Sequence, residues 1–179
     1  MSDTWRPGLG VVIGTALTGL ALGVVMGAVW WWVTPTEQWI RIDGGLGAAD
    51  LSASSWFAAD GWFLILGVIA GLLLTGITWA LFRTRPVALV IGIVLGAALL
   101  SLVAWSVGGV LGPPDATSVA DSLPIGSNVD GSLGLRALGV LGAPAVSALA
   151  LLALLIAVAP VTEDWQRQVP QQPAGVGTS

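Results

Sequence analysis

Four long apolar runs separated by short polar segments dominate the pattern along the chain. They cover residues 9–33, 61–82, 87–111 and 135–159, and their only charged residue is Arg136, near the start of the fourth. An α-helix rises 1.5 Å per residue, so about 20 residues cross the ~30 Å hydrocarbon core of a bilayer. The pattern therefore predicts an all-α protein, a four-helix transmembrane bundle.

The polar connections predict a small cap on one end of this bundle. Residues 39–43 alternate between apolar and polar side chains, residues 44–45 are two glycines, and residues 46–51 are able to return as a second strand. We expect a short β-hairpin here. Residues 112–134 are rich in Gly, Pro, Ser and Asp and predict an irregular loop.

A proline and a tryptophan run refine the expected helices. Trp30-Trp31-Trp32 is expected in the interfacial belt of the bilayer, where the first helix ends. Pro144 lies inside the fourth run, so it should free the carbonyl of Val140 and bend that helix. The four helices form a single membrane domain over residues 1–160, and residues 161–179 are expected to be a disordered cytoplasmic tail.

The arginines predict the orientation. With four spans, the N-terminus, the second-to-third connection and the C-terminal tail share one side. That side carries four arginines and the opposite side two, so the positive-inside rule places both termini in the cytoplasm. The first group is Arg6, Arg83, Arg85 and Arg167, and the second is Arg41 and Arg136. The acidic residues of the first and third connections then make the outer face acidic.

Composition excludes several classes of function. Only 9% of the residues are charged, whereas soluble domains carry about a quarter. The chain has no Cys, His, Lys or Tyr, which removes thiol chemistry and the commonest metal ligand. We therefore predict no catalytic, cofactor-binding or metal site. The net charge of −4 does not indicate nucleic-acid binding.

Glycines recur at four-residue spacing inside the apolar runs, most regularly at Gly19, Gly23 and Gly27. Small residues with this spacing form a groove that lets another helix backbone approach closely. We expect these grooves to pack the four helices against one another. The alternative is that the first ladder faces a partner subunit or a second copy.

Asp60, Gly61 and Trp62 stand at the expected outer end of the second span. A carboxylate at a helix N-terminus accepts backbone N–H groups, so capping is the simplest role for Asp60. The more specific hypothesis is an ion pair with Arg136, because the second and fourth spans begin on the same face. Such a pair would hold the outer end of the bundle together or recognise a partner.

The stretch Phe57-Ala58-Ala59-Asp60-Gly61-Trp62-Phe63 resembles the signature of an uncharacterised family of actinobacterial four-pass membrane proteins, a domain of unknown function. The tryptophan run at residues 30–32 and the turn at residues 83–86 are also similar. The resemblance implies a bacterial plasma membrane protein. It assigns no catalytic or binding residue.

The sequence favours a non-enzymatic accessory or interaction protein of the bacterial cell envelope. Besides the lipid bilayer, its partner would be an envelope membrane protein or a second copy. The alternative is a channel or transporter component for a small or lipid-like substrate. A wet or lipid-filled cavity lined by polar interior residues would favour transport, whereas a dry, glycine-packed interior would favour the accessory role. Those residues are Thr15, Thr18, Thr78 and Ser101.

Overall fold

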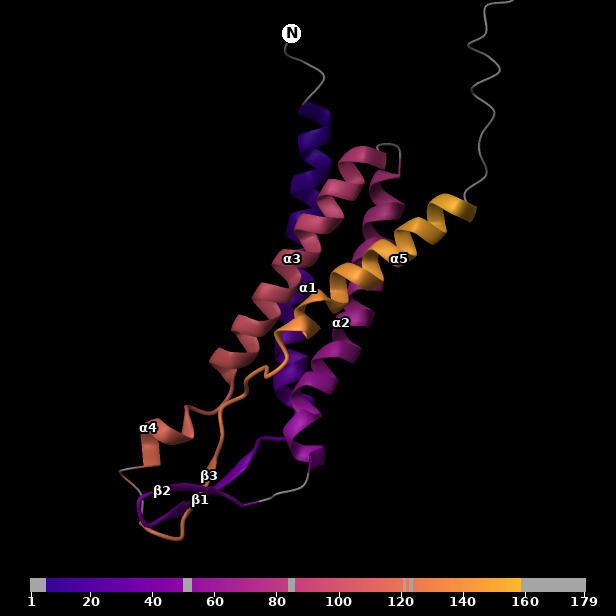
Figure 1. The fold of residues 1–179 in the computed structure, drawn as a ribbon. Coiled ribbons are helices and arrows are strands. Elements are labelled where there is room, and N and C mark those ends of the chain that lie inside the picture. Colours follow the sequence, from indigo (N-terminus) through magenta and orange to yellow (C-terminus); the bar gives the residue numbers. More distant parts are fainter. Residues whose placement is uncertain (1–5, 50–52, 84–85, 121, 123, 159–179) are drawn as a thin grey trace, which may run out of the picture.

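Four long helices lie side by side in the computed structural model (Figure 1), which describes residues 6–49, 53–83, 86–120, 122 and 124–158. They are α1 (Arg6–Val33), α2 (Ala53–Phe82), α3 (Pro86–Leu111) and α5 (Ala143–Val158). Within the described residues, four segments are long and apolar enough to cross a membrane, with mean hydropathies from 2.2 to 2.8. The predicted four-helix architecture is confirmed at this level.

The two ends of the bundle differ. Figure 1 shows that the beginning of α1, the end of α2, the beginning of α3 and the end of α5 lie at one end, and that a small sheet lies at the other. We call the sheet and the segments around it, residues 34–49 and 112–137, the cap. The tail predicted over residues 161–179 lies outside the described residues.

Glycines bring α1 and α3 into close contact. On Gly19, Gly23 and Gly27, a Cβ atom would meet main-chain carbonyl oxygens of α3, at 2.8 Å for Gly23 and 2.6 Å for Gly27. The facing carbonyls belong, in order, to Gly96, Leu100 and Ala104. Because a facing backbone gives way less easily than a side chain, this ladder fits only residues without a Cβ. It faces α3 of the same chain and is covered by it.

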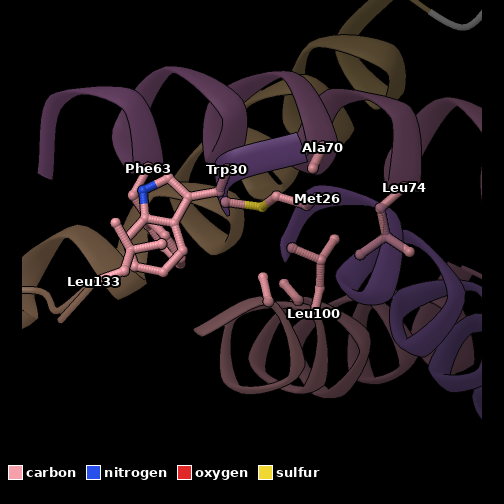
Figure 2. Close-up of a cluster of buried hydrophobic side chains, with 9 residues drawn as sticks. Met26, Trp30, Phe63, Ala70, Leu74, Leu100 and Leu133 are labelled. Carbon is pink, nitrogen blue, oxygen red and sulfur yellow. The ribbon is translucent and has the colours of Figure 1, made fainter. Parts of the chain in front are cut away.

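A buried cluster joins three helices to the cap (Figure 2). Met26 and Trp30 of α1, Phe63 of α2 and Leu100 of α3 pack together, and Leu133 of the cap lies against the same cluster. A Cβ on Gly112 would lie 2.9 Å from the Cβ of Leu133, so the segment after α3 approaches closely as well. The cap is thus packed onto the bundle through apolar side chains.

The fourth apolar run differs from its prediction. Its residues 135–137 are not helical, and its helical part begins as a 3₁₀-helix, η1 (Leu138–Gly142), which passes directly into α5. Pro144 is the second residue of α5, where its missing N–H costs no helix bond. The carbonyl of Val140 accepts the N–H of Ala143, so the expected free carbonyl and mid-helix bend are wrong. Together η1 and α5 still extend about 34 Å, from rises of ~2.0 and 1.5 Å per residue.

The predicted hairpin is confirmed as part of a larger sheet. Strands β1 (Gln38–Ile42) and β2 (Gly45–Ala48) pair antiparallel, with Ile40 opposite Gly47. The connecting Gly44 has φ +87°, a left-handed conformation that glycine adopts at little cost. A third strand, β3 (Asn128–Asp130), pairs with β1, so the order is β2-β1-β3.

The third connection is more ordered than predicted. Instead of an irregular loop throughout, it contains the short helix α4 (Ala116–Ala120) and strand β3. The pairing of β3 with β1 joins the first and third connections into one unit. The cap is therefore assembled from two segments that lie far apart in the sequence.

Candidate functional site

Asp60 lies about two turns inside α2, which begins at Ala53 rather than at residue 61. The prediction that it caps its own helix is therefore wrong. Its side chain is only 7% exposed. One carboxylate oxygen accepts the main-chain N–H of Arg136 at 3.1 Å, and the other accepts that of Ala137 at 3.0 Å. Ala137 is the N-cap residue of η1, so Asp60 satisfies main-chain donors at the start of a neighbouring helix.

The Arg136 guanidinium forms an ion pair with Glu37, which precedes β1. Its Nη2 lies 2.8 Å and 2.9 Å from the two carboxylate oxygens of Glu37. Asp60 thus binds the main chain of Arg136 and not its guanidinium. The guanidinium forms its ion pair with Glu37 instead of with Asp60, the partner we expected. Arg136 therefore connects the bundle, through Asp60, to the sheet, through Glu37.

A double-mutant cycle separates these two links. The Glu37 and Arg136 side chains are 26% and 44% exposed, so solvent screens their ion pair. We expect a coupling free energy of about 0.5 kcal/mol between Glu37→Gln and Arg136→Gln. Asp60→Asn and Arg136→Gln should be closer to additive, because Asp60 accepts main-chain donors. Denaturant unfolding in micelles measures both couplings, and a larger Asp60–Arg136 coupling would contradict this assignment.

Trp30 supports the turn of α2 that carries Asp60. Its ring is fully buried, and its Nε1 donates a hydrogen bond to the carbonyl of Ala59 at 2.9 Å. The ring also meets Phe63 edge to face, with centroids 5.1 Å apart, an arrangement that favours aromatic pairs. Trp30 is therefore a core residue and not part of an interfacial belt, whereas Trp31 and Trp32 are exposed.

Gly61 and Trp62 do not join this cluster. Gly61 is exposed, with nothing within 4 Å of a Cβ added to it, and Trp62 is 40% exposed. Helical geometry separates the four residues, because Asp60 and Phe63 are three apart on one face and the two between them turn away. Of the predicted site residues, the structure brings together Asp60 and Arg136, and Gly19, Gly23 and Gly27 line the α1–α3 contact.

A partly open pocket of about 710 Å³ lies in the cap, beside the Glu37–Arg136 pair. Its walls come from the first strand pair, the start of α4 and the segment between β3 and η1. The lining residues are Glu37, Trp39, Gly45, Leu46, Asp115, Ala116, Thr117, Gly131, Ser132, Gly134, Leu135 and Arg136. Both connections contribute, so the pocket exists because the sheet joins them.

The polar groups of the pocket carry both signs of charge. Glu37 and Arg136 pair on one side, and on the other the Asp115 carboxylate accepts a hydrogen bond from the Ser132 hydroxyl at 3.0 Å. A Cβ on Gly131 would lie 2.7 Å from Nε1 of Trp39, so the indole lies directly against this glycine. Charged and aromatic side chains therefore line the same pocket. No group of three or more metal-ligating side chains is found among the described residues.

Sequence reasoning missed most of this pocket. Glu37, Trp39 and Asp115 were not candidates, because they stand in two connections whose pairing no local pattern reveals. The sequence feature that pointed to the pocket was the alternation of residues 39–43. It predicts that β1 is a strand, and a strand can pair with a neighbour on each side. Its second partner, β3, has only three residues.

The polar residues inside the bundle are accounted for by hydrogen bonds to main chain. Thr15, Thr78 and Ser101 are buried, and their hydroxyls donate to carbonyls of their own helices. Ser101 is also 2.8 Å from the carbonyl of Leu141 in η1, and Thr75 donates to Ala148 of α5 at 2.9 Å. Neither these residues nor Thr18 line the pocket in the cap.

The fold and the pocket define a class: a four-helix bundle of membrane-spanning length with a small mixed cap that holds a pocket. The chain matches no family model, no curated protein and no solved structure at a significant level.

Proposed function

We propose that this chain is a non-enzymatic membrane protein whose cap binds a partner protein of the bacterial cell envelope. The observation that carries the proposal is the contrast between the two parts of the molecule. The cap holds a pocket of about 710 Å³ with charged and aromatic walls, whereas the bundle below it is packed through glycines and buried apolar side chains.

The cap is held firmly enough to present a defined surface. Leu133 packs into the buried cluster, Asp60 accepts two main-chain N–H groups from the segment before η1, and Glu37 pairs with Arg136. A preorganised site loses less conformational entropy on binding than a mobile loop does. Binding at the cap is therefore favoured over a role as a passive connection.

The interior supports the accessory role over transport. The buried hydroxyls donate to helix carbonyls, and the glycines of α1 lie against the backbone of α3. A second close contact joins α2 to α5, where a Cβ on Gly67 would lie 3.2 Å from the ring of Pro144. A route between α1 and α3, or between α2 and α5, would need to separate the two helices of that pair.

The distribution of arginines between the two ends of the bundle supports an orientation with both termini in the cytoplasm and the cap outside. Arg83 directly follows α2, which ends at the end of the bundle opposite the cap (Figure 1). With Arg6, Arg85 and Arg167 assigned to that same side by sequence, the positive-inside rule places that end in the cytoplasm and the cap outside. Reporter fusions at the C-terminus and in the cap would test this directly.

Site-specific photo-cross-linking in the native membrane tests the proposed interaction. A photoreactive residue at Thr117, an exposed position in the pocket wall, should form an adduct with one discrete protein. The matched control is Ile77, which is 40% exposed on α2 and should react with lipid. Mass spectrometry of the adducts identifies what each position contacts.

Three other cross-linking results would contradict the proposal. A protein adduct at Ile77 but not at Thr117 would move the contact surface to the helices and contradict a role for the cap. Reaction of Thr117 with a second copy of this chain alone would contradict an accessory role. The absence of any protein adduct would contradict the proposed interaction.

A further inference from the structure

We propose that the pocket of the cap takes an extended, basic segment of the partner polypeptide, with a lysine or arginine side chain against Asp115 and the peptide main chain along strand β2. This inference rests on the proposed function and names the chemistry of its partner. It follows from the charges of the pocket, from the position of β2 and from the apolar wall between them.

Asp115 is the charged group of the pocket with capacity for a ligand. Glu37 is paired with Arg136 at 2.8 Å, which neutralises that side. The Asp115 carboxylate accepts a hydrogen bond from Ser132, and within the described ranges no guanidinium is placed against it. A carboxylate in this position selects a cationic group and repels an anionic one.

The wider cap reinforces that selection. Acids outnumber arginines in the two connections that build it, and Asp43 and Asp130 are both exposed there. Such an excess of one sign attracts a partner of the opposite sign and speeds its encounter. A basic segment therefore fits both the pocket and its surroundings.

Strand β2 favours a peptide over a small amine. The strand order β2-β1-β3 leaves β2 at an edge of the sheet, and its Gly45 and Leu46 line the pocket. An edge strand presents main-chain N–H and C=O groups that an extended peptide pairs with. Gly45 and Gly47 carry no side chain, so they leave room for a second backbone to approach.

The remaining wall fits the stem of a long basic side chain. Leu46, Ala116 and Leu135 line the pocket with apolar atoms, and the Trp39 indole lies on its β1 side. Lysine and arginine cover apolar surface with their methylene groups while their charged ends pair elsewhere, and an indole face attracts a cation. The volume of about 710 Å³ lies within the ~300–1,000 Å³ typical of ligand pockets.

Peptide binding to the purified full chain in nanodiscs of neutral lipid tests the inference. The probe is a fluorescent, end-blocked peptide that alternates valine and lysine, and its counterpart alternates valine and glutamate. Fluorescence anisotropy should show saturable binding of the lysine peptide, weakened by salt, and no binding of the glutamate peptide. Asp115→Asn keeps an acceptor for Ser132 and should weaken binding about tenfold, the factor for one partly screened charge pair.

The matched control is Asp43→Asn, which removes the same charge from an exposed cap position outside the pocket. It should change affinity less than about twofold. Equal losses in the two variants would overturn the assignment to the pocket, and so would equal binding of the two peptides. Competition by free lysine amide at the same concentration as the peptide would show a small-cation site and contradict the role of β2.

Failure of this inference is distinguishable from failure of the proposed function. If the lysine peptide does not bind but Thr117 still cross-links to a discrete envelope protein, the cap is an interaction site for a partner of different chemistry. If the peptide binds and cross-linking yields no protein, the proposed function fails although the pocket chemistry is right.

Discussion

Replacing Gly19 with alanine is expected to destabilise the bundle by about 1–3 kcal/mol, the usual cost of overpacking a tight contact. The added Cβ would collide with the carbonyl oxygen of Gly96 in α3. Because both sides of the contact are main chain, α1 and α3 must move apart as whole helices. Tryptophan fluorescence during denaturation in mixed micelles measures the loss.

Gly10→Ala is the matched control on the same helix. Nothing lies within 4 Å of a Cβ added to Gly10, so its replacement should cost no stability, and the helix propensity of alanine should add up to about 1 kcal/mol. An equal loss of stability at the two positions would mean that the α1–α3 contact does not govern the response, because the better helix propensity of alanine cannot cause a loss. Such a result would contradict the role assigned to the glycine ladder.

Removing the Asp60 carboxylate is the other change with a large expected effect. Asp60→Ala leaves the main-chain N–H groups of Arg136 and Ala137 without their acceptor at a part-buried position. We expect a loss of about 2–4 kcal/mol, because each such donor is worth roughly 1–3 kcal/mol when left unpaired. Faster amide hydrogen exchange at Arg136 and Ala137 should accompany the loss and locate it.

Two further variants identify the cause of that loss. Asp60→Asn retains one acceptor oxygen and should lose about half as much stability. Asp43→Ala removes an exposed carboxylate of the cap and should cost less than about 0.5 kcal/mol. If Asp43→Ala proved as damaging as Asp60→Ala, net charge rather than the hydrogen bonds to the segment before η1 would explain the result.

The helices were predictable from sequence because their signal is local. A run of apolar residues without charge and of bilayer length identifies each span whatever its neighbours do. The same holds for the hairpin, where alternation and a glycine turn act within a few residues. The second helix was expected to begin at Asp60 or Ser55, and α2 begins at Ala53, with polar residues such as Ser54 and Ser55 ahead of its apolar run.

The missed features depend on contacts between distant segments. Strand β3 has three residues, Asn128, Val129 and Asp130, and is a strand only because β1 offers it an edge. The pocket exists only once that pairing is made. Arg136 illustrates the same limit. The second and fourth spans begin on the same face, which suggested an ion pair with Asp60, but the folded cap pairs the guanidinium with Glu37 and turns the Arg136 main chain towards Asp60.

The glycine ladder shows what sequence leaves open even when a motif is recognised. Four-residue spacing at Gly19, Gly23 and Gly27 predicts a close helix contact, but it does not identify the helix on the other side. The structure identifies it, since all three glycines lie against α3. The ladder is therefore covered within this chain.

Native mass spectrometry of the protein gently extracted from its own membrane tests the central claim most directly. The account predicts a complex in which this chain and a second polypeptide occur in a fixed ratio, and in which the Glu37–Arg136 region of the cap is protected from hydrogen exchange. A bare monomer, or an assembly of this chain alone, would contradict the accessory role and would make reconstituted flux assays the next experiment.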